Sequence, residues 1–208
     1  MRSRPVRADA QQNVARILEA AQVVFAKDPN ATLEQVAEQA GLARTTVHRR
    51  FSSRQVLLAA LVNDLNARYS DAFERARVST APPMVALYRL TEMAFELKVS
   101  HPFVTGLIPS LSSPGSPALV PEIQEGLDLL FARLHAAGQI AVDDPPWCRR
   151  LYLVLLHQVH ELSAEAPVLR AGSEAPDDEV GARVRLLVET LLGALGGRRQ
   201  GDPAPSGR

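Results

Sequence analysis

Hydrophobic residues recur at helical spacing along most of the chain, and no segment shows the strict alternation typical of a half-buried strand. The first such stripe lies within residues 11–27 and consists of Val14, Ile17, Leu18, Ala21, Val24 and Phe25. Another follows Ser53, a residue suited to cap a helix, and consists of Val56, Leu57, Ala60, Leu61 and Leu65. These patterns predict an all-α protein.

Between these two stripes, residues 32–51 contain two short helical patterns separated by a turn. Thr32 and Gln35 have the spacing of a capping box, so we expect a helix to begin at Leu33. Gly41 is suited to end this helix, because glycine adopts the left-handed backbone conformation at low cost. In the second helix, Val47 and Phe51 are four residues apart and face inward. This order is typical of a helix-turn-helix DNA-binding motif.

The outer side of the second helix is basic, which is the property that DNA contact requires. Arginine and threonine side chains donate hydrogen bonds to phosphate oxygens and base edges. The alternative is a surface helix that happens to be basic. We expect Thr32 and Arg54 to contact phosphates and the remaining residues to lie on or beside the groove. The predicted DNA-binding residues are Thr32, Arg44, Thr45, Thr46, His48, Arg49, Arg50 and Arg54.

The distribution of charge supports this interpretation, although the formal net charge of the 208-residue chain is zero. Residues 1–56 contain nine Arg and Lys against five Asp and Glu, so this segment carries a net charge of +4 and the remainder −4. Such asymmetry favours a protein with one end against DNA. Residues 1–10 contain three arginines, and we expect a flexible basic arm there and a disordered tail at 198–208.

Further helices are predicted in the rest of the chain, at 84–99, 103–111, 118–137, 145–164 and 177–196. The last two are apolar over more than one face, so they require either a partner chain or a central position in the monomer. For an interface we expect contributions from His157, His160, Val184, Val188 and Leu191. A spacing of three also puts the two histidines on one helical face, but without a third ligand we predict no metal site.

A small-molecule site is expected between the helices at 84–99, 103–111, 118–137 and 146–163. Apolar residues outnumber polar ones in these helices, so the expected effector is largely hydrophobic. Glu92 is the polar group that we expect to orient it, with a solvated helix face as the alternative. The candidate ligand-binding residues are Tyr88, Glu92, Phe95, Phe103, Phe131, Trp147 and Tyr152, the aromatic ones having core packing as their alternative role.

The block ILEAAQVVFAKDPNATLEQVAEQAGLARTTVHRRFSSRQVLL resembles the TetR family of bacterial repressors. The resemblance covers about Val14 to Leu61 and rests on Val-Ala-x-x-Ala-Gly followed by Thr-Val-x-x-x-Phe. Ala43 and His48 depart from the family's usual Ser or Thr cap and tyrosine, so the operator sequence does not carry over. The resemblance implies a dimer that pairs its two C-terminal helices across a twofold axis and releases a near-palindromic operator when a small molecule binds.

The predicted organisation is a flexible arm at 1–10, a three-helix helix-turn-helix DNA-binding domain at 11–56, a helical ligand-binding and dimerisation domain at 57–197 and the tail. The expected partners are double-stranded DNA, a small molecule and a second copy of the chain. No phosphate loop, zinc-protease motif or nucleophile elbow is present, so we predict neither an enzyme nor a cofactor. One cysteine and no membrane-length apolar run fit a cytoplasmic protein. The alternatives are an activator and a helical protein–protein adaptor without DNA binding.

Overall fold

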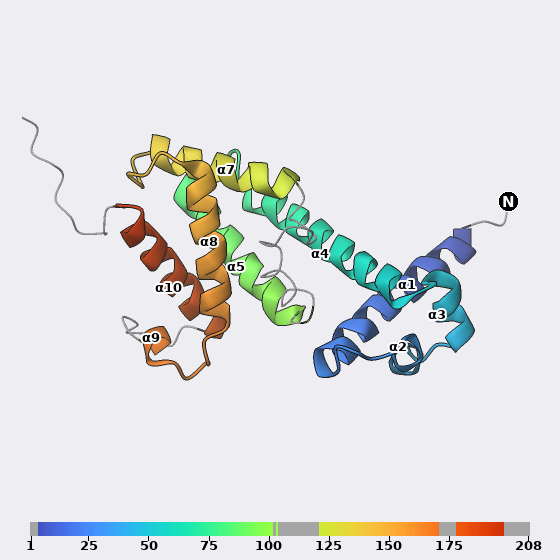
Figure 1. Ribbon diagram of the computed structural model, residues 1–208. Helices are drawn as coiled ribbons and strands as arrows, with labels where there is room; N and C mark the ends of the chain where they lie inside the picture. The colour runs from blue at the N-terminus through green and yellow to red at the C-terminus, as the bar shows by residue number, and fades with distance from the viewer. Residues whose placement is uncertain (1–3, 102, 104–120, 171–177, 198–208) are drawn as a thin grey trace, which may run out of the picture. The chain divides into compact units, whose positions relative to one another are not determined.

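The computed structural model describes residues 4–101, 103, 121–170 and 178–197, and the regular elements within these ranges are helices (Figure 1). They form two compact units: the chain passes from the first to the second between Ala67 and Arg68, and Ser100, His101 and Phe103 belong to the first again. This point lies inside one long helix, α4 (Arg54–Ala76), which therefore contributes to both units. The all-α class predicted from the sequence is confirmed. The assignment of functions to residues 11–56 and 57–197 stays a prediction.

The first unit contains α1 (Arg4–Lys27), α2 (Leu33–Ala40), α3 (Arg44–Arg50) and the beginning of α4. Helix α2 packs against both α1 and α3. The residues predicted to face inward form a shared core, because removal of their apolar surface from water stabilises the packed helices. Its fully buried members include Ile17, Ala21, Phe25, Val36, Val47 and Leu57.

Local hydrogen bonds begin and end these helices where the sequence predicts. The Thr32 hydroxyl accepts from the Gln35 amide at 3.4 Å, and the Thr32 amide donates to Oε1 of Gln35 at 2.7 Å, which completes the capping box. Gly41 has φ +63°, and the amides of Gly41 and Leu42 donate to the carbonyls of Glu38 and Ala37. These two bonds form a Schellman motif that satisfies the last carbonyls of α2.

The beginning of the chain differs from the flexible arm that we predicted at residues 1–10. Helix α1 begins at Arg4, so residues 4–10 are helical, whereas residues 1–3 lie outside the described part. Residues with good helix propensity, among them Ala8, Ala10 and Gln11, extend the helix beyond its buried stripe. Pro5 lies in the first turn, where its missing amide proton removes no intrahelical bond.

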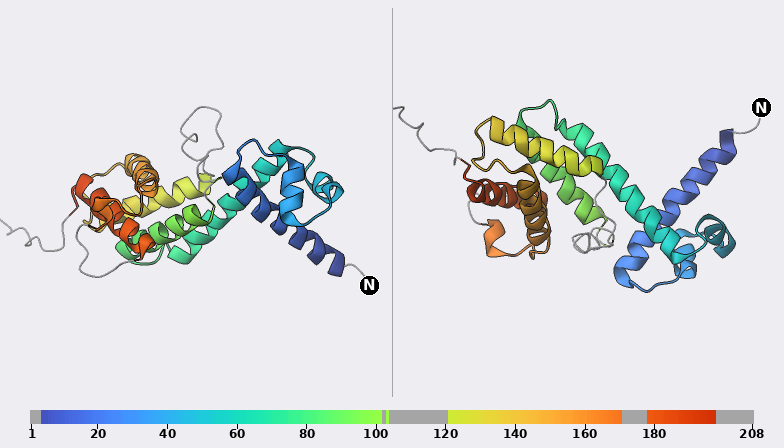
Figure 2. Two further views of the ribbon diagram at one scale, coloured as in Figure 1. Left: turned by 90° about the horizontal axis from the view of Figure 1, so that it is seen from below. Right: turned by 45° about the horizontal axis from the view of Figure 1, so that its top comes forward.

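The second unit contains the end of α4, followed by α5 (Pro83–Ser100), α7 (Pro121–Ala136), α8 (Pro145–His160), α9 (Pro167–Arg170) and α10 (Glu179–Ala194). Helix α8 packs against α7 and α10, and it lies beside α10 in both Figure 1 and Figure 2. The fully buried residues of this unit include Leu87, Phe95, Leu130, Leu134, Leu187, Val188 and Leu191.

The predicted C-terminal helices are confirmed, with differences at their ends. Asp144 caps α8 through a 2.9 Å bond from the Trp147 amide, and the prolines at its start are tolerated there. Helix α8 ends at His160 rather than 164, and the four-residue α9 lies between the helices predicted at 145–164 and 177–196. Most of the predicted helix at 103–111 and the predicted tail lie outside the described residues. No helix in the described part combines the length and hydropathy needed to cross a membrane.

Candidate functional site

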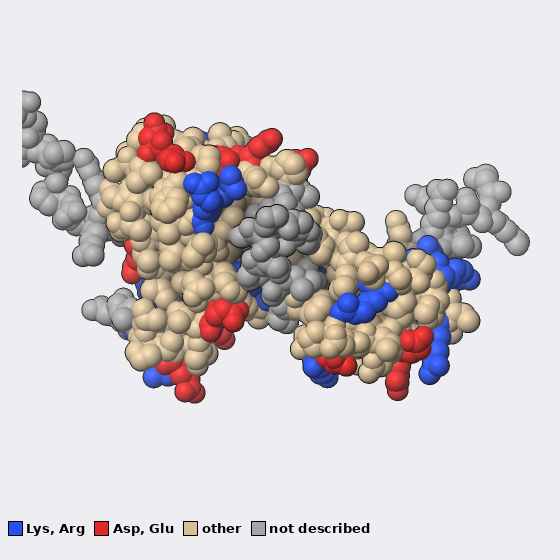
Figure 3. All heavy atoms as spheres, in the orientation of Figure 1, with Lys and Arg blue, Asp and Glu red and all other residues tan. Residues whose placement is uncertain are grey.

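Helix α3 presents a polar and basic surface, because its apolar side is used for packing. Val47 is fully buried and Phe51, at the end of the helix, is 6% exposed, so these two residues hold α3 against the core of the first unit. Thr46 is half-buried, and the other predicted groove residues are exposed, namely Arg44, Thr45, His48, Arg49 and Arg50. Figure 3 shows Lys and Arg side chains at the surface of the unit that contains α2 and α3.

Glu34 and His48 connect the two helices of the motif on its outer side. Oε1 of Glu34 lies 3.0 Å from Nε2 of His48. This hydrogen bond, together with bonds from its own backbone amide and from Thr32, lowers the pKa of Glu34 to about 2. His48 was expected at the DNA from its place on the second helix of the motif, whereas no sequence pattern marks Glu34. His48, which was predicted to lie at the DNA groove, therefore also links α3 to α2 through Glu34.

Arg54 occupies a different environment from the phosphate contact that we predicted. Its guanidinium donates to the backbone carbonyl of Pro29 and lies 5.0 Å from the centre of the Phe25 ring. The side chain is half-buried, and its Nε atom is buried without a partner among the described residues. Arg54 thus joins the start of α4 to the turn after α1. Its primary contacts are structural, although the guanidinium has five donor hydrogens in total.

Arg16 is a second positioning residue in this unit, and the sequence analysis did not identify it. Its Nη2 atom donates to the carbonyl of Ala40 at 2.7 Å, so it binds the C-terminal end of α2 from α1. A cation at this end of a helix satisfies an unpaired carbonyl and complements the helix dipole. No pattern in the sequence distinguishes Arg16 from other exposed arginines, because its partner is a backbone atom 24 residues away.

In the second unit, part of the predicted ligand-binding set is brought together in the interior. Phe95, Phe131 and Tyr152 are at most 2% exposed, and the rings of Phe131 and Tyr152 meet edge to face at 6.0 Å. The Tyr152 hydroxyl lies 3.3 Å from the hydroxyl of the fully buried Thr91. Burial raises the pKa of Tyr152 to about 12, so it is an uncharged hydrogen-bonding group at neutral pH.

The structure contradicts the interior position predicted for three members of this set. Tyr88 and Trp147 are 42% and 48% exposed, and Glu92 is also exposed. Tyr88 and Glu92 are four residues apart on α5, so they lie on one exposed side of the helix, whereas Thr91 is fully buried. The ring of Phe103 lies 5.2 Å from that of Phe25 and belongs to the first unit. The interior polar group that the sequence analysis missed is Thr91.

Three of the five predicted interface residues are buried within the chain itself. Val184, Val188 and Leu191 are at most 7% exposed within a single chain, so their side chains are used in the core of their own unit. His157 and His160 are half-buried, and the carbonyl of His160 accepts a hydrogen bond from Arg183 at 3.1 Å. The periodic pattern could not distinguish an inward apolar face from an outward one, because both satisfy the same spacing.

A different set of apolar residues faces solvent on α8. Val154 is 58% exposed and Trp147 48%, and Leu151 and Leu155 are half-buried. Trp147, Leu151 and Val154 follow one another at spacings of four and three, so they form a stripe along one side of the helix. Hereafter the residues Trp147, Leu151, Val154 and Leu155 are called the α8 stripe. The described part of the chain leaves much of this apolar surface uncovered.

Comparisons with known proteins agree with this arrangement. Residues 17–61 match the family described as bacterial regulatory proteins, tetR family. The chain is 30% identical over 167 residues to the HTH-type transcriptional repressor LfrR of Mycolicibacterium smegmatis, covering 79% of this chain and 87% of LfrR. The crystal structure of LfrR in complex with proflavine, from Mycobacterium smegmatis, superposes with a TM-score of 0.60 at 27% identity, covering 90% of this chain and 96% of that one.

The fold alone is also shared with the more distant regulator PfmR of Thermus thermophilus, at 21% identity. That comparison has a TM-score of 0.61 and covers 89% of this chain and all of the other. The helix-turn-helix geometry, the family match within it and the relative that spans most of the chain lead to one conclusion. The chain belongs to the TetR family of bacterial regulatory proteins.

Proposed function

We propose that this chain is a ligand-responsive transcriptional repressor that binds a near-palindromic operator as a homodimer and releases it when a small molecule binds. The observation that carries this proposal is the exposed basic side of α3, which is held rigidly by Val47 and Phe51. Arg44, Thr45, His48, Arg49 and Arg50 have no apolar packing role there, and their donors suit phosphates and base edges. The relative that is 30% identical is a repressor.

The dimer follows from the symmetry of such an operator. A twofold dimer with its recognition helices about 34–36 Å apart reads two half-sites one turn of DNA apart. The α8 stripe supplies a surface for it, because its apolar residues are exposed in the single chain and an isologous contact buries two copies at once.

Residues 11–56 are assigned to DNA binding. Residues 57–197 are assigned to ligand binding and dimerisation, and thus to the regulation of DNA binding. LfrR has been solved with proflavine, a small molecule. An effector changes operator affinity only by its differential affinity for two conformations of the dimer. We assign this chain a regulatory rather than a catalytic role, in the cytoplasm, where bacterial DNA lies.

The first test is a footprint of the purified protein on genomic DNA, followed by binding measurements on the protected sequence. Arg44→Ala is expected to weaken binding, to relax the sequence preference and to flatten the salt dependence by about one unit. The matched control is Arg89→Ala, which removes an exposed arginine from α5 in the second unit. Equal binding by both variants and the wild-type protein would contradict the proposal, as would the absence of any protected sequence.

A further inference from the structure

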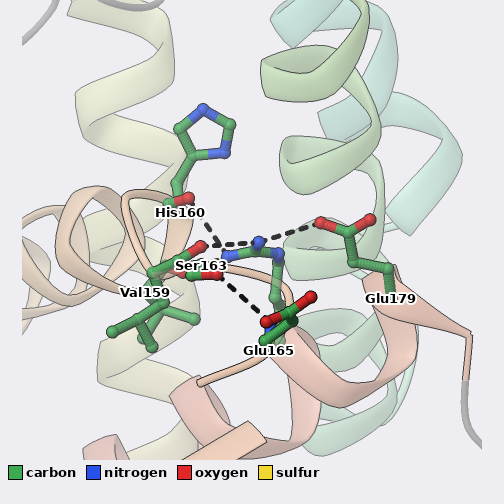
Figure 4. A network of polar contacts seen from close by, with 7 residues as sticks. Val159, His160, Ser163, Glu165 and Glu179 are labelled. Carbon is green, nitrogen blue, oxygen red and sulfur yellow. Dashed lines mark hydrogen bonds and ion pairs between the residues drawn. The ribbon is translucent and has the colours of Figure 1, made fainter.

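The interior of the second unit contains two basic side chains that are each only 4% exposed, Lys98 on α5 and Arg183 on α10. Arg183 is well paired. It donates to the carbonyls of Val159, His160 and Leu162 at the end of α8, and it forms a 2.9 Å ion pair with Glu179. Figure 4 shows the carbonyls of Val159 and His160 and the Glu179 carboxylate around one guanidinium group. Arg183 therefore caps α8, and its charge has a structural partner.

Lys98 has no such partner in the described part of the chain. No hydrogen bond or ion pair links its ammonium group to a described residue, and the acidic group whose charge acts on it is the exposed Glu161. Burial lowers the pKa of Lys98, and the charge of Glu161 opposes this shift. A partly desolvated ammonium group gains free energy when an anion pairs with it. The position thus favours an anionic partner from outside the chain.

His160 provides a second unpaired polar group within electrostatic reach of Lys98. Its Nδ1 atom is buried and has no hydrogen-bond partner among the described residues. Its backbone carbonyl belongs to the Arg183 network, but in Figure 4 its imidazole ring points away from that network. Burial is the main reason that the pKa of His160 is lowered, and the charge of Lys98 adds to it. A neutral imidazole still offers a ring N–H as a donor.

The buried hydroxyl pair of Thr91 and Tyr152 lies on the same two helices. Thr91 precedes Lys98 by seven residues on α5, and Tyr152 precedes His160 by eight on α8. At 1.5 Å per residue, these separations correspond to about 10 Å and about 12 Å along the helices, close to two turns each. Seven residues return to nearly the same side of α5, whereas eight residues leave Tyr152 and His160 about 80° apart around α8. Between them lie the buried apolar residues Ala94, Phe95 and Leu156.

We propose that the interior between α5 and α8 binds a small apolar organic acid, with its anionic group held by Lys98 and His160. The apolar body of the acid lies against Ala94, Phe95 and Leu156, and the hydroxyl pair of Thr91 and Tyr152 receives a polar group at its far end. This inference rests on the proposed function, because the acid is the effector of the ligand-responsive regulator. It replaces Glu92, whose exposed carboxylate repels an anion, as the polar group of the site.

The test uses two fluorescent probes that differ by one anionic group, 8-anilinonaphthalene-1-sulfonate and its uncharged parent N-phenyl-1-naphthylamine. The wild-type protein is expected to bind the sulfonate at one site per chain and at least tenfold more tightly than the parent. Lys98→Met removes the charge but keeps an apolar side chain of similar length, and this preference is expected to fall at least tenfold. Lys27→Met is the matched control, because Lys27 is the other lysine of the chain and is exposed on α1.

A measurement on the wild-type chain keeps the proposal testable even if the variant does not fold. With two lysines in the sequence, selective ¹³C labelling gives two side-chain signals, which Lys27→Met assigns. Addition of the sulfonate is expected to shift the Lys98 signal and to leave that of Lys27 in place. An unmoved Lys98 signal, an absence of saturable sulfonate binding, or the wild-type preference in folded Lys98→Met would each overturn the proposal.

Operator binding by the wild-type protein, measured without probe in the same preparation, separates the two levels of inference. Loss of probe selectivity with intact operator binding would reject the organic-acid site alone. Selective sulfonate binding by a protein that protects no DNA would reject the proposed repressor function and leave the site standing.

Discussion

The contacts of Arg54 give a prediction that distinguishes a positioning residue from a DNA-binding one. Arg54→Ala removes a charged hydrogen bond to Pro29, which is worth about 1.5–3 kcal/mol, and a contact with the Phe25 ring, worth about 0.5–1 kcal/mol. The upper ends of these two ranges are not expected to add in full, because the side chain is only half-buried and its Nε atom has no partner among the described residues. We predict that the first unit loses about 2 kcal/mol of stability.

Hydrogen exchange measured by mass spectrometry can locate this loss. Peptides from α1, α2 and the start of α4 are expected to exchange faster in Arg54→Ala, whereas peptides from α8 serve as an internal standard in the second unit. Operator affinity is then measured against salt concentration. The slope is expected to match that of the wild-type protein, because a residue that contacts no phosphate releases no counterion.

Arg50→Ala is the matched variant, since Arg50 is exposed at the end of α3. It is expected to flatten the salt slope by about 0.9 with unchanged exchange rates. The opposite result for Arg54→Ala, with unchanged exchange in the first unit and a slope flattened by about one, would refute the positioning role and restore the phosphate contact inferred from the sequence.

Three further predictions concern the helix-turn-helix motif and the dimer. The pKa of Glu34 is lowered from 4.5 to about 2, so the stability that this carboxylate contributes is present above pH 4.5 and is lost as the pH falls toward 2. Glu34→Gln should therefore flatten the dependence of stability on acid pH, measured by urea unfolding. An unchanged pH profile in the variant would exclude the bond between Glu34 and His48 as the source of that dependence. Val154→Glu places a charge in the α8 stripe and should give monomers in analytical ultracentrifugation with native helix content, whereas an intact dimer would move the interface elsewhere. Gly41→Ala should destabilise the protein by about 1 kcal/mol because Gly41 has a positive φ. Gly193→Ala, at an open position inside a helix, should stabilise the protein by a similar amount. Thermal unfolding should show a lower melting temperature for the first variant and a higher one for the second.

The helix-turn-helix motif could be predicted from the sequence because its determinants are local. The capping box joins Thr32 and Gln35, three residues apart, and Gly41 ends the same helix through bonds within one turn. Val47 and Phe51 define the inward side of α3 by their spacing, so its outward side follows without any knowledge of distant contacts. The start of α8 is equally local, because Asp144 caps the helix and two prolines follow it directly.

Other features depended on the tertiary structure, because they join residues far apart in the sequence or choose between equivalent faces. Arg54 could be recognised as basic, but only the fold brings it to the carbonyl of Pro29 and the ring of Phe25. Likewise, Lys98 is one charge on a mostly apolar helix until the fold buries it within the field of His160 and Glu161.

The two apolar helices α8 and α10 show this limit most clearly. Their periodicity predicted burial, but a helix with apolar residues on more than one side satisfies that pattern in several orientations. The sequence by itself thus determined the helices, their caps and the basic face of α3, since these follow from interactions within a few turns. Only the packed structure decided that Val188 and Leu191 lie in the core while Val154 faces solvent. The physical reason is that burial depends on which surfaces the other helices already cover, and that information is carried by the whole chain.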